Sequence, residues 1–207
     1  MGNGARTQDQ AVRAMEACRA LFCKKLQDYG AAWRILRPTS VTDQIFIKAR
    51  RIRSLETQGE ALVDEGIYPE FQAIVNYGIV ALIQLELGYA EGADLTNEEA
   101  LAHYDRHAQR ALALMLRKNH DYAEAWRSMR VSSYTDIILQ KLFRTKQIEQ
   151  NEGKTLVSEG VGANYMDMVN YAIFALIKLT EEGEPVPSDY ITPPETGPGA
   201  CCVSQEA

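Results

Sequence analysis

The chain has 207 residues, of which 46% are hydrophobic and 24% are charged, and its formal net charge is −6 at pH 7. This apolar content is sufficient for a sizeable core. No apolar run reaches the roughly 18 residues of a membrane-spanning helix, and the N-terminus lacks the apolar core of a signal peptide, so we expect a cytoplasmic protein with no membrane partner. Because the net charge is negative, we expect no strong nucleic-acid binding.

Apolar residues at helical spacing predict three helices in the first half of the chain. The first covers about residues 10–27. The second begins at Ser40, because a hydroxyl followed three residues later by Asp43 has the pattern of a capping box. The third covers about residues 68–87 and is the most apolar, which predicts a place at the centre of a bundle.

The second half predicts the same three elements after a connection over residues 88–95 that is rich in glycine and acidic side chains. Its first helix covers about residues 97–119 and follows a capping box formed by Thr96 and Glu99. A further capping box, Ser133 with Asp136, predicts the start of the next helix. The last helix is expected over about residues 162–180.

The two halves are copies of one unit. Residues 28–56 align without gaps on residues 121–149 with 13 of 29 identical, and residues 65–83 align on residues 159–177 with 9 of 19 identical. Two copies of this length predict an all-α fold in which duplicated three-helix units pack as an intramolecular pseudo-dimeric helical bundle. The predicted parts of the chain are a first helical repeat over 8–88, a second over 96–182, and a disordered tail over 183–207.

Basic residues are concentrated in the repeated segments. Residues 28–56 contain six basic and three acidic side chains. Lys48 and Arg51 share one helix face, and so do their counterparts Lys141 and Arg144. Long cations on a common face are suited to clamping a polyphosphate, whereas the alternative is a structural ion pair with a neighbouring carboxylate.

Polar and aromatic residues recur at equivalent positions in the two copies. Asn76 and Asn170 lie inside apolar helices, where an amide without a partner costs about 1–3 kcal/mol, so each either fixes the packing of the helices or binds a ligand. Trp33 and Trp126 follow a predicted turn and either stack on a base or anchor the turn on the bundle. Asp167, one turn before Asn170, requires a partner or a metal ion if it is buried.

These motifs recur in order and resemble a known family. The series D-Y with A-W-R, S-x-T-D-x-I with a following Lys and Arg, E-G, and an apolar helix with N-Y is similar to the nucleotide modification associated domain, type 1, over about residues 21–85 and 114–179. That domain is similar in turn to the MazG-like all-α nucleoside triphosphate pyrophosphohydrolases, which hold Mg²⁺ on E-x-x-E and E-x-x-D helices.

The resemblance implies a nucleotide-binding protein, and a Mg²⁺-dependent pyrophosphohydrolase acting on (deoxy)nucleoside triphosphates. In the second copy the acidic signature is the degenerate Asp167-x-x-Asn170. The alternative is a non-catalytic helical binding or assembly module, and association of chains into a homo-oligomer stays open. The catalytic residues implied are Glu159 and Asp167. The metal ligands implied are Glu149, Glu152, Glu159 and Asp167. The substrate-binding residues expected are Lys48, Arg51, Lys141, Arg144, Trp33, Trp126, Asn76 and Asn170.

Overall fold

The computed structural model describes residues 3–58, 66–155 and 159–183, and every regular element in these ranges is a helix. The all-α prediction is confirmed. The tail predicted over 183–207 lies, apart from Gly183, outside the described residues. The elements in chain order are α1 (Asn3–Tyr29), η1 (Ala32–Ile35), α2 (Pro38–Gln58), α3 (Tyr68–Leu87), α4 (Asn97–Asp121), η2 (Ala125–Ser128), α5 (Val131–Gln150) and α6 (Val161–Glu182).

The predicted start of α4 is confirmed. Thr96 Oγ1 accepts a hydrogen bond from the Glu99 amide at 3.2 Å, and the Thr96 amide donates to Glu99 Oε2 at 2.9 Å. The bounds predicted for α3 also agree with the structure, whereas α1 begins seven residues before the predicted residue 10, at Asn3.

The capping boxes predicted at Ser40 and Ser133 are wrong as helix starts. Both helices begin two residues earlier, α2 at Pro38 and α5 at Val131. Proline is well suited to a first helical position because it has no amide hydrogen to leave unpaired. At α5 the residue before the helix is Arg130, and no side chain caps the free amides.

The predicted capping acids, Asp43 and Asp136, instead form ion pairs between the two repeats. Lys146 Nζ lies 2.5 Å from Asp43 Oδ1, and Arg53 Nη1 lies 3.5 Å from Asp136 Oδ1. The two pairs are the same contact made twice, with the repeats exchanged. Because both acids are largely exposed, we expect the pairs to set the registry of α2 on α5 more than to stabilise the fold.

A second contact between α2 and α5 is also made twice. Thr42 Oγ1 donates to Glu149 Oε1 at 2.6 Å, and its counterpart Thr135 donates to Glu56 Oε1 at 2.9 Å. Tyr165 OH donates to the same Glu149 oxygen at 3.2 Å. Both threonines are fully buried, so these bonds satisfy hydroxyls that water does not reach.

The centre of the bundle is the crossing of α3 and α6. Nearly all of the middle of each helix is buried, and residues of both repeats form one hydrophobic cluster. Gly78 lies where the two helices are closest: a Cβ atom added there would lie 2.5 Å from Val169 Cγ2. The absence of a side chain at Gly78 therefore permits this close approach.

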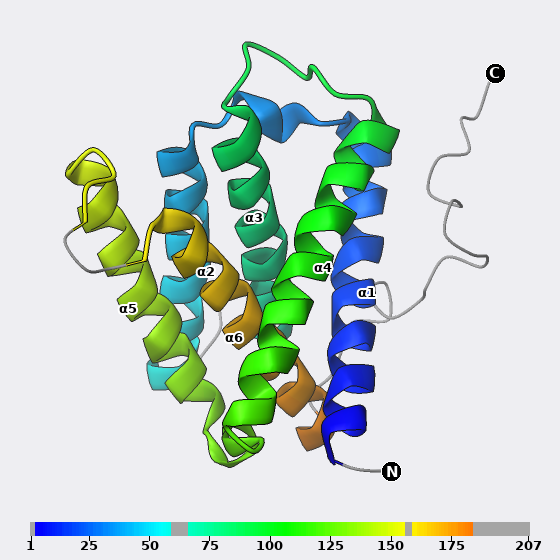
Figure 1. Cartoon of the computed structure of the whole chain (residues 1–207), viewed down its shortest axis with the longest axis vertical. Coiled ribbons are helices and arrows are strands. Elements are labelled where there is room, and N and C mark those ends of the chain that lie inside the picture. Colours follow the sequence, from blue (N-terminus) through cyan, green and yellow to red (C-terminus); the bar gives the residue numbers. More distant parts are fainter. Residues whose placement is uncertain (1–2, 59–65, 156–158, 184–207) are drawn as a thin grey trace.

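The other helices pack in a pattern that is the same in both repeats. α2 packs on α3 as α5 packs on α6, and α1 pairs with α4 as α2 pairs with α5. Figure 1 shows η1 and η2 at opposite ends of the bundle. An internal two-fold axis would produce this distribution, and the pseudo-dimer remains our interpretation of it. Within the described ranges, no helix combines the length and the apolar character needed to cross a bilayer.

We predict that Gly78→Ala is less stable than Gly162→Ala by about 1–3 kcal/mol, because its methyl group overpacks the α3–α6 crossing. The control adds the same methyl to α6 at a place where the nearest atom, Leu85 Cδ1, is 3.7 Å away. Urea unfolding followed by circular dichroism measures both. Equal stability of the two variants would contradict the close contact assigned to Gly78.

Candidate functional site

Two cavities occupy equivalent positions in the two repeats. Each lies where the C-terminal end of the repeat's first helix, the following 3-10 turn and the middle of its third helix meet, and all eleven residues around the second have counterparts around the first. The first pocket has a volume of about 280 Å³ and the second about 210 Å³. The first pocket includes Lys25, Tyr29, Trp33, Ala73, Asn76 and Tyr77. The second pocket includes the corresponding Lys118, Tyr122, Trp126, Asp167, Asn170 and Tyr171.

A sharp turn after the first helix of each repeat places the tryptophan in the pocket. In the first repeat Gly30 has a φ of 60°, in the left-handed region that glycine adopts readily. In the second repeat two non-glycine residues are left-handed, Ala123 with a φ of 47° and Glu124 with a φ of 59°. Glu124 is held there by hydrogen bonds from Thr7 at 2.8 Å and Arg127 at 2.6 Å, so the strained backbone of the second pocket is fixed by side chains.

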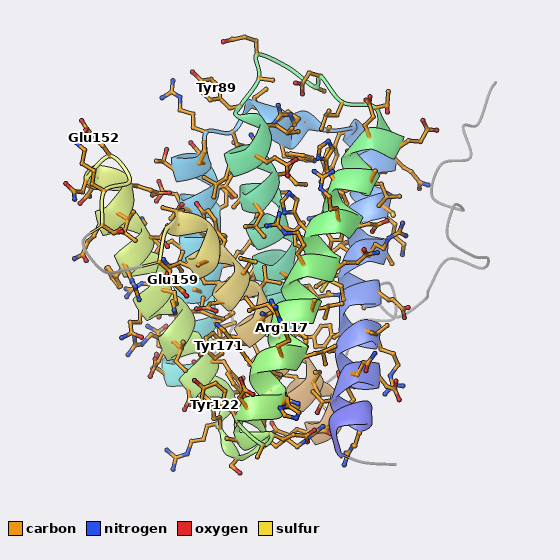
Figure 2. The ribbon with its side chains drawn as sticks, in the orientation of Figure 1. Tyr89, Arg117, Tyr122, Glu152, Glu159 and Tyr171 are labelled. Atoms are coloured by element: carbon orange, nitrogen blue, oxygen red, sulfur yellow. The ribbon has the colours of Figure 1, made fainter. Side chains whose placement is uncertain are left out.

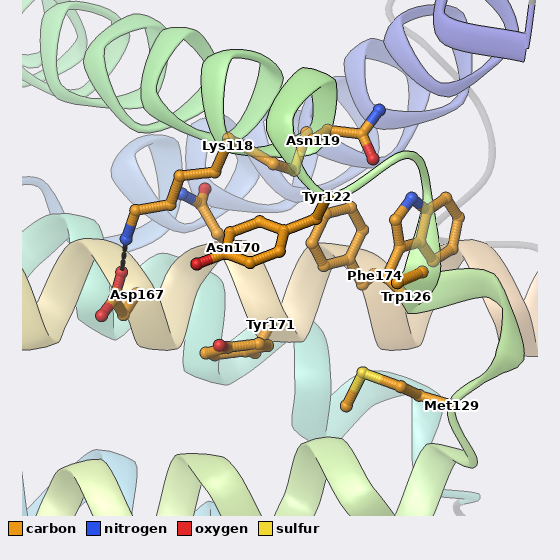
Figure 3. A pocket seen from close by; sticks show the side chains of 11 residues that line it. Lys118, Asn119, Tyr122, Trp126, Met129, Asp167, Asn170, Tyr171 and Phe174 are labelled. Carbon is orange, nitrogen blue, oxygen red and sulfur yellow. Dashed lines mark hydrogen bonds and ion pairs between the residues drawn. The ribbon is translucent and has the colours of Figure 1, made fainter.

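Trp126 forms an aromatic wall of the second pocket. Its ring stacks on Phe174 with centroids 4.5 Å apart and an interplanar angle of 16°, and the Arg127 guanidinium lies 4.3 Å from the ring centroid. Its buried Nε1 has no hydrogen-bond partner. The anchoring role considered for Trp126 fits this packing, and the ring still borders the cavity beside Tyr122 and Tyr171 (Figure 3).

The two repeated asparagines have different surroundings. In the first repeat Asn76 Nδ2 donates to the Cys18 carbonyl at 3.1 Å, and Tyr104 OH donates to Asn76 Oδ1 at 2.7 Å. In the second repeat neither Nδ2 nor Oδ1 of Asn170 has a partner, although only 6% of that residue is exposed. The shift between the copies places Ala11 at the position of Tyr104, so the second repeat lacks the hydroxyl that satisfies the first.

Two lysines bind the carboxylate of the second pocket. Lys118 Nζ lies 2.7 Å from Asp167 Oδ1 (Figure 3). Lys141 Nζ lies 2.6 Å from Asp167 Oδ2. Burial raises the pKa of Asp167, but the two lysines outweigh this effect and the pKa is lowered. Burial likewise lowers the pKa of Lys118, but the bond to Asp167 and the nearby charge of Glu159 raise it overall.

In the first repeat the carboxylate lies one turn earlier on the third helix. Lys48 Nζ is 3.2 Å from the buried Glu70 Oε2, and Arg51 donates a hydrogen bond to Glu70 Oε1. The structural ion pair that was the alternative to a phosphate clamp is therefore formed here. Asn164 replaces Glu70 in the second repeat, and Arg144, the counterpart of Arg51, has no ion pair among the described residues.

The four carboxylates predicted to bind Mg²⁺ are not brought together. Glu149 accepts hydrogen bonds from Thr42 and Tyr165, and both Asp167 oxygens are occupied by lysines. Glu152 pairs with Lys154 at 2.8 Å at the end of α5, apart from Glu159 and the tyrosines of the second pocket (Figure 2). No group of three or more metal-binding side chains occurs in the described parts of the chain. As arranged, these residues do not fit a magnesium ion, and magnesium binding stays a prediction.

Four residues of the pockets were not among those predicted from the sequence: Lys25, Lys118, Tyr29 and Tyr122. Their repetition could have identified them, because a shift of 93 positions aligns Lys25 with Lys118 and Tyr29 with Tyr122. Of the residues that were predicted, each pocket includes one tryptophan and one asparagine, and Lys141 reaches the second pocket through Asp167.

The comparisons with known proteins identify the repeated unit. A family model described as nucleotide modification associated domain 1 matches residues 25–85 and 118–179. These two regions contain all the residues that line the two pockets except Phe22 and Met115. Neither the comparison with curated proteins nor the comparison with solved structures returned a match.

We predict that Asp167→Asn lowers the free energy of unfolding by about 1–3 kcal/mol near pH 7, because it leaves two lysines without their anion. The folded pKa of Asp167 is below its usual 3.8, so the stabilisation is present above that value and is lost as the pH falls through the folded pKa. Urea unfolding of both proteins across this range measures it.

Asp136→Asn is the matched control, because Asp136 is exposed and its pairing with Arg53 is at 3.5 Å. We expect this variant to differ from the unaltered protein by less than about 1 kcal/mol. A stability difference for Asp167→Asn that persists unchanged at acidic pH would contradict the assigned ion pairs.

Proposed function

Since the chain belongs to the nucleotide modification associated domain 1 family, we propose that it binds a nucleotide, with the base in the second pocket. One observation carries this proposal: the Asn170 amide is buried beside an aromatic cavity with both its donor and its acceptor unpaired. Leaving such groups unpaired costs about 1–3 kcal/mol, so a ligand that pairs with them gains binding energy from a feature that weakens the unliganded fold.

The chemistry of the pocket suits a nucleobase. An asparagine amide offers one donor and one acceptor side by side, the pattern that pairs with a base edge. Aromatic side chains provide stacking surfaces for a base, and Tyr122, Tyr171 and Trp126 border the cavity. Asn119 Oδ1 and Trp126 Nε1 are further buried polar atoms without partners at the same cavity.

The size of the pocket limits what enters it. Its volume of about 210 Å³ is below the roughly 300–1,000 Å³ of pockets that enclose drug-sized ligands. The base therefore occupies the pocket, and the sugar and phosphates extend outside it. Arg144, one turn from Lys141 on α5 and without an ion pair among the described residues, is the predicted phosphate-binding residue that remains available in this repeat.

Hydrolysis of a bound nucleoside triphosphate to monophosphate and pyrophosphate, with Mg²⁺, is the catalytic form of this proposal. It rests on the resemblance of the acidic positions to those of the MazG-like enzymes and not on the observed geometry, because Lys118 and Lys141 occupy both Asp167 oxygens. A magnesium ion would require these carboxylates to exchange their lysine and hydroxyl partners for the metal. Cytoplasmic location and association of chains remain predictions from sequence alone.

We predict that Asn170→Leu weakens nucleotide binding about tenfold or more and raises the free energy of unfolding by about 1–3 kcal/mol. Leucine has a similar size and removes the unpaired amide. The measurement is calorimetric titration with the four deoxynucleoside triphosphates and their nucleosides, together with urea unfolding. Ion-exchange chromatography of the same mixtures with Mg²⁺ detects any pyrophosphate released.

Asn76→Leu is the matched control, and we expect the opposite effect on stability. It removes both hydrogen bonds of the Asn76 amide and leaves the buried Tyr104 hydroxyl with only its 4.0 Å contact to Met15 Sδ, so the free energy of unfolding falls by about 1–3 kcal/mol. Base binding in the second pocket stays unchanged. If no nucleotide or nucleoside binds, or if Asn170→Leu binds as tightly as the unaltered protein, the non-catalytic assembly module becomes the better account.

A further inference from the structure

We propose that the first pocket is a second and chemically different site, which holds a phosphate group between Lys25 and Lys48. The phosphate would take the place that the Asp167 carboxylate has in the second pocket. This inference concerns the other repeat and other residues, so it does not depend on base binding by Asn170.

The first pocket is a cavity with the same aromatic border as the second. Its volume is about 280 Å³, and Tyr29, Trp33 and Tyr77 line it. Its asparagine, Asn76, is fully occupied by Cys18 and Tyr104. A ligand of this pocket therefore finds aromatic surface but no free amide, and recognition must come from charge.

Within the aligned residues 65–83 and 159–177, charge on the third helix differs at two positions, Ala73/Asp167 and Glu70/Asn164, and of these only Ala73 and Asp167 line the pockets. In the second pocket Asp167 binds Lys118 and Lys141 together. In the first pocket Ala73 stands at the position of Asp167. The two lysines are present in both repeats, whereas the anion between them is present in one.

The two lysines of the first repeat differ in their pairing. Lys48 pairs with Glu70, which Arg51 also contacts. Lys25 has no ion pair among the described residues. In the second repeat the equivalent lysines, Lys118 and Lys141, both reach the carboxylate at the position of Ala73, so we infer that Lys25 and Lys48 can share an anion there. Burial, followed by repulsion from Lys48, lowers the pKa of Lys25, in agreement with this placement.

The two repeats carry the same charges in different places. Each has three cations and one carboxylate at the corresponding positions. They are Lys25, Lys48, Arg51 and Glu70 in the first repeat, and Lys118, Lys141, Arg144 and Asp167 in the second. Moving the carboxylate by one turn leaves the unpaired cation inside the first pocket, at Lys25, and away from the second pocket, at Arg144. A phosphate monoester attached to an aromatic base matches lysines beside an aromatic wall.

The test changes Ala73, the pocket-lining position at which the second repeat has Asp167. Ala73→Asp places a carboxylate beside Lys25 and Lys48, and we expect it to weaken binding of a phosphate monoester in the first pocket at least about tenfold and to raise the melting temperature. Ala73→Asn has the same shape without the charge, and we expect it to retain binding. Both are titrated by calorimetry with deoxynucleoside 5′-monophosphates, the matching deoxynucleosides and inorganic phosphate, beside the Asn170→Leu variant, in which only the first pocket is intact.

The outcomes separate this inference from the proposed function. Loss of monophosphate binding in Ala73→Asp, with Ala73→Asn unaffected, supports the phosphate site, and a preference for monophosphates over inorganic phosphate identifies the monoester as its ligand. Equal binding of inorganic phosphate supports the same site with free phosphate as its ligand. Unchanged affinity in Ala73→Asp, equal losses in both Ala73 variants, or no phosphate-dependent binding by Asn170→Leu would overturn the proposal, whatever the result for the second pocket.

Discussion

The close packing of α3 against α6 is the constraint on which the rest of the structure depends. These two helices supply most of the buried side chains, and the missing side chain of Gly78 lets the backbones approach where Val169 crosses it. Each helix also carries the asparagine of its repeat, so the crossing fixes where both amides point. The outer helices, α1 with α4 and α2 with α5, pack around the pair, and α1 and α4 with the 3-10 turns that follow them form the remaining pocket walls.

Much of the fold follows from the sequence because its signals are local. Apolar spacing identified α3 within its observed bounds, and the Thr96–Glu99 pattern identified the start of α4. The starts of α2 and α5 were misplaced because Asp43 and Asp136 have a capping pattern but pair with cations of the other repeat. A contact between residues about a hundred positions apart leaves no mark on local spacing.

The sequence allowed some of the residues of the site to be predicted, but not their hydrogen-bond and ion-pair partners. The tryptophans and asparagines that line the pockets could be identified because they recur at equivalent positions in the two copies. It could not show that Asn76 is satisfied by Tyr104, because that hydroxyl comes from the other repeat. Nor could it show which cation meets which carboxylate. The acidic positions Glu70 and Asp167 differ by one helical turn after alignment, and only the packed helices reveal that both receive the repeated lysine.

Duplication followed by divergence gives a consistent physical account of the two pockets. The aromatic walls and the lysines are retained in both copies, while the amide is satisfied in one and unpaired in the other, and the carboxylate is internal in one and replaced by Ala73 in the other. The first pocket therefore has no unpaired amide, and the second pocket has a carboxylate between its lysines where the first has none. Under the two proposals, the second pocket binds a base through Asn170 and the first pocket binds a phosphate group through its lysines.

The most direct test of this account is a ¹H–¹⁵N correlation spectrum of the asparagine side-chain amides, recorded as deoxynucleosides are added. The account predicts that one of the four nucleosides shifts the Asn170 amide signals, as its donor and acceptor gain partners, while the Asn76 signals stay in place because their partners are internal. Asn170 signals that remain unchanged with every nucleoside, or Asn76 signals that move equally, would contradict it.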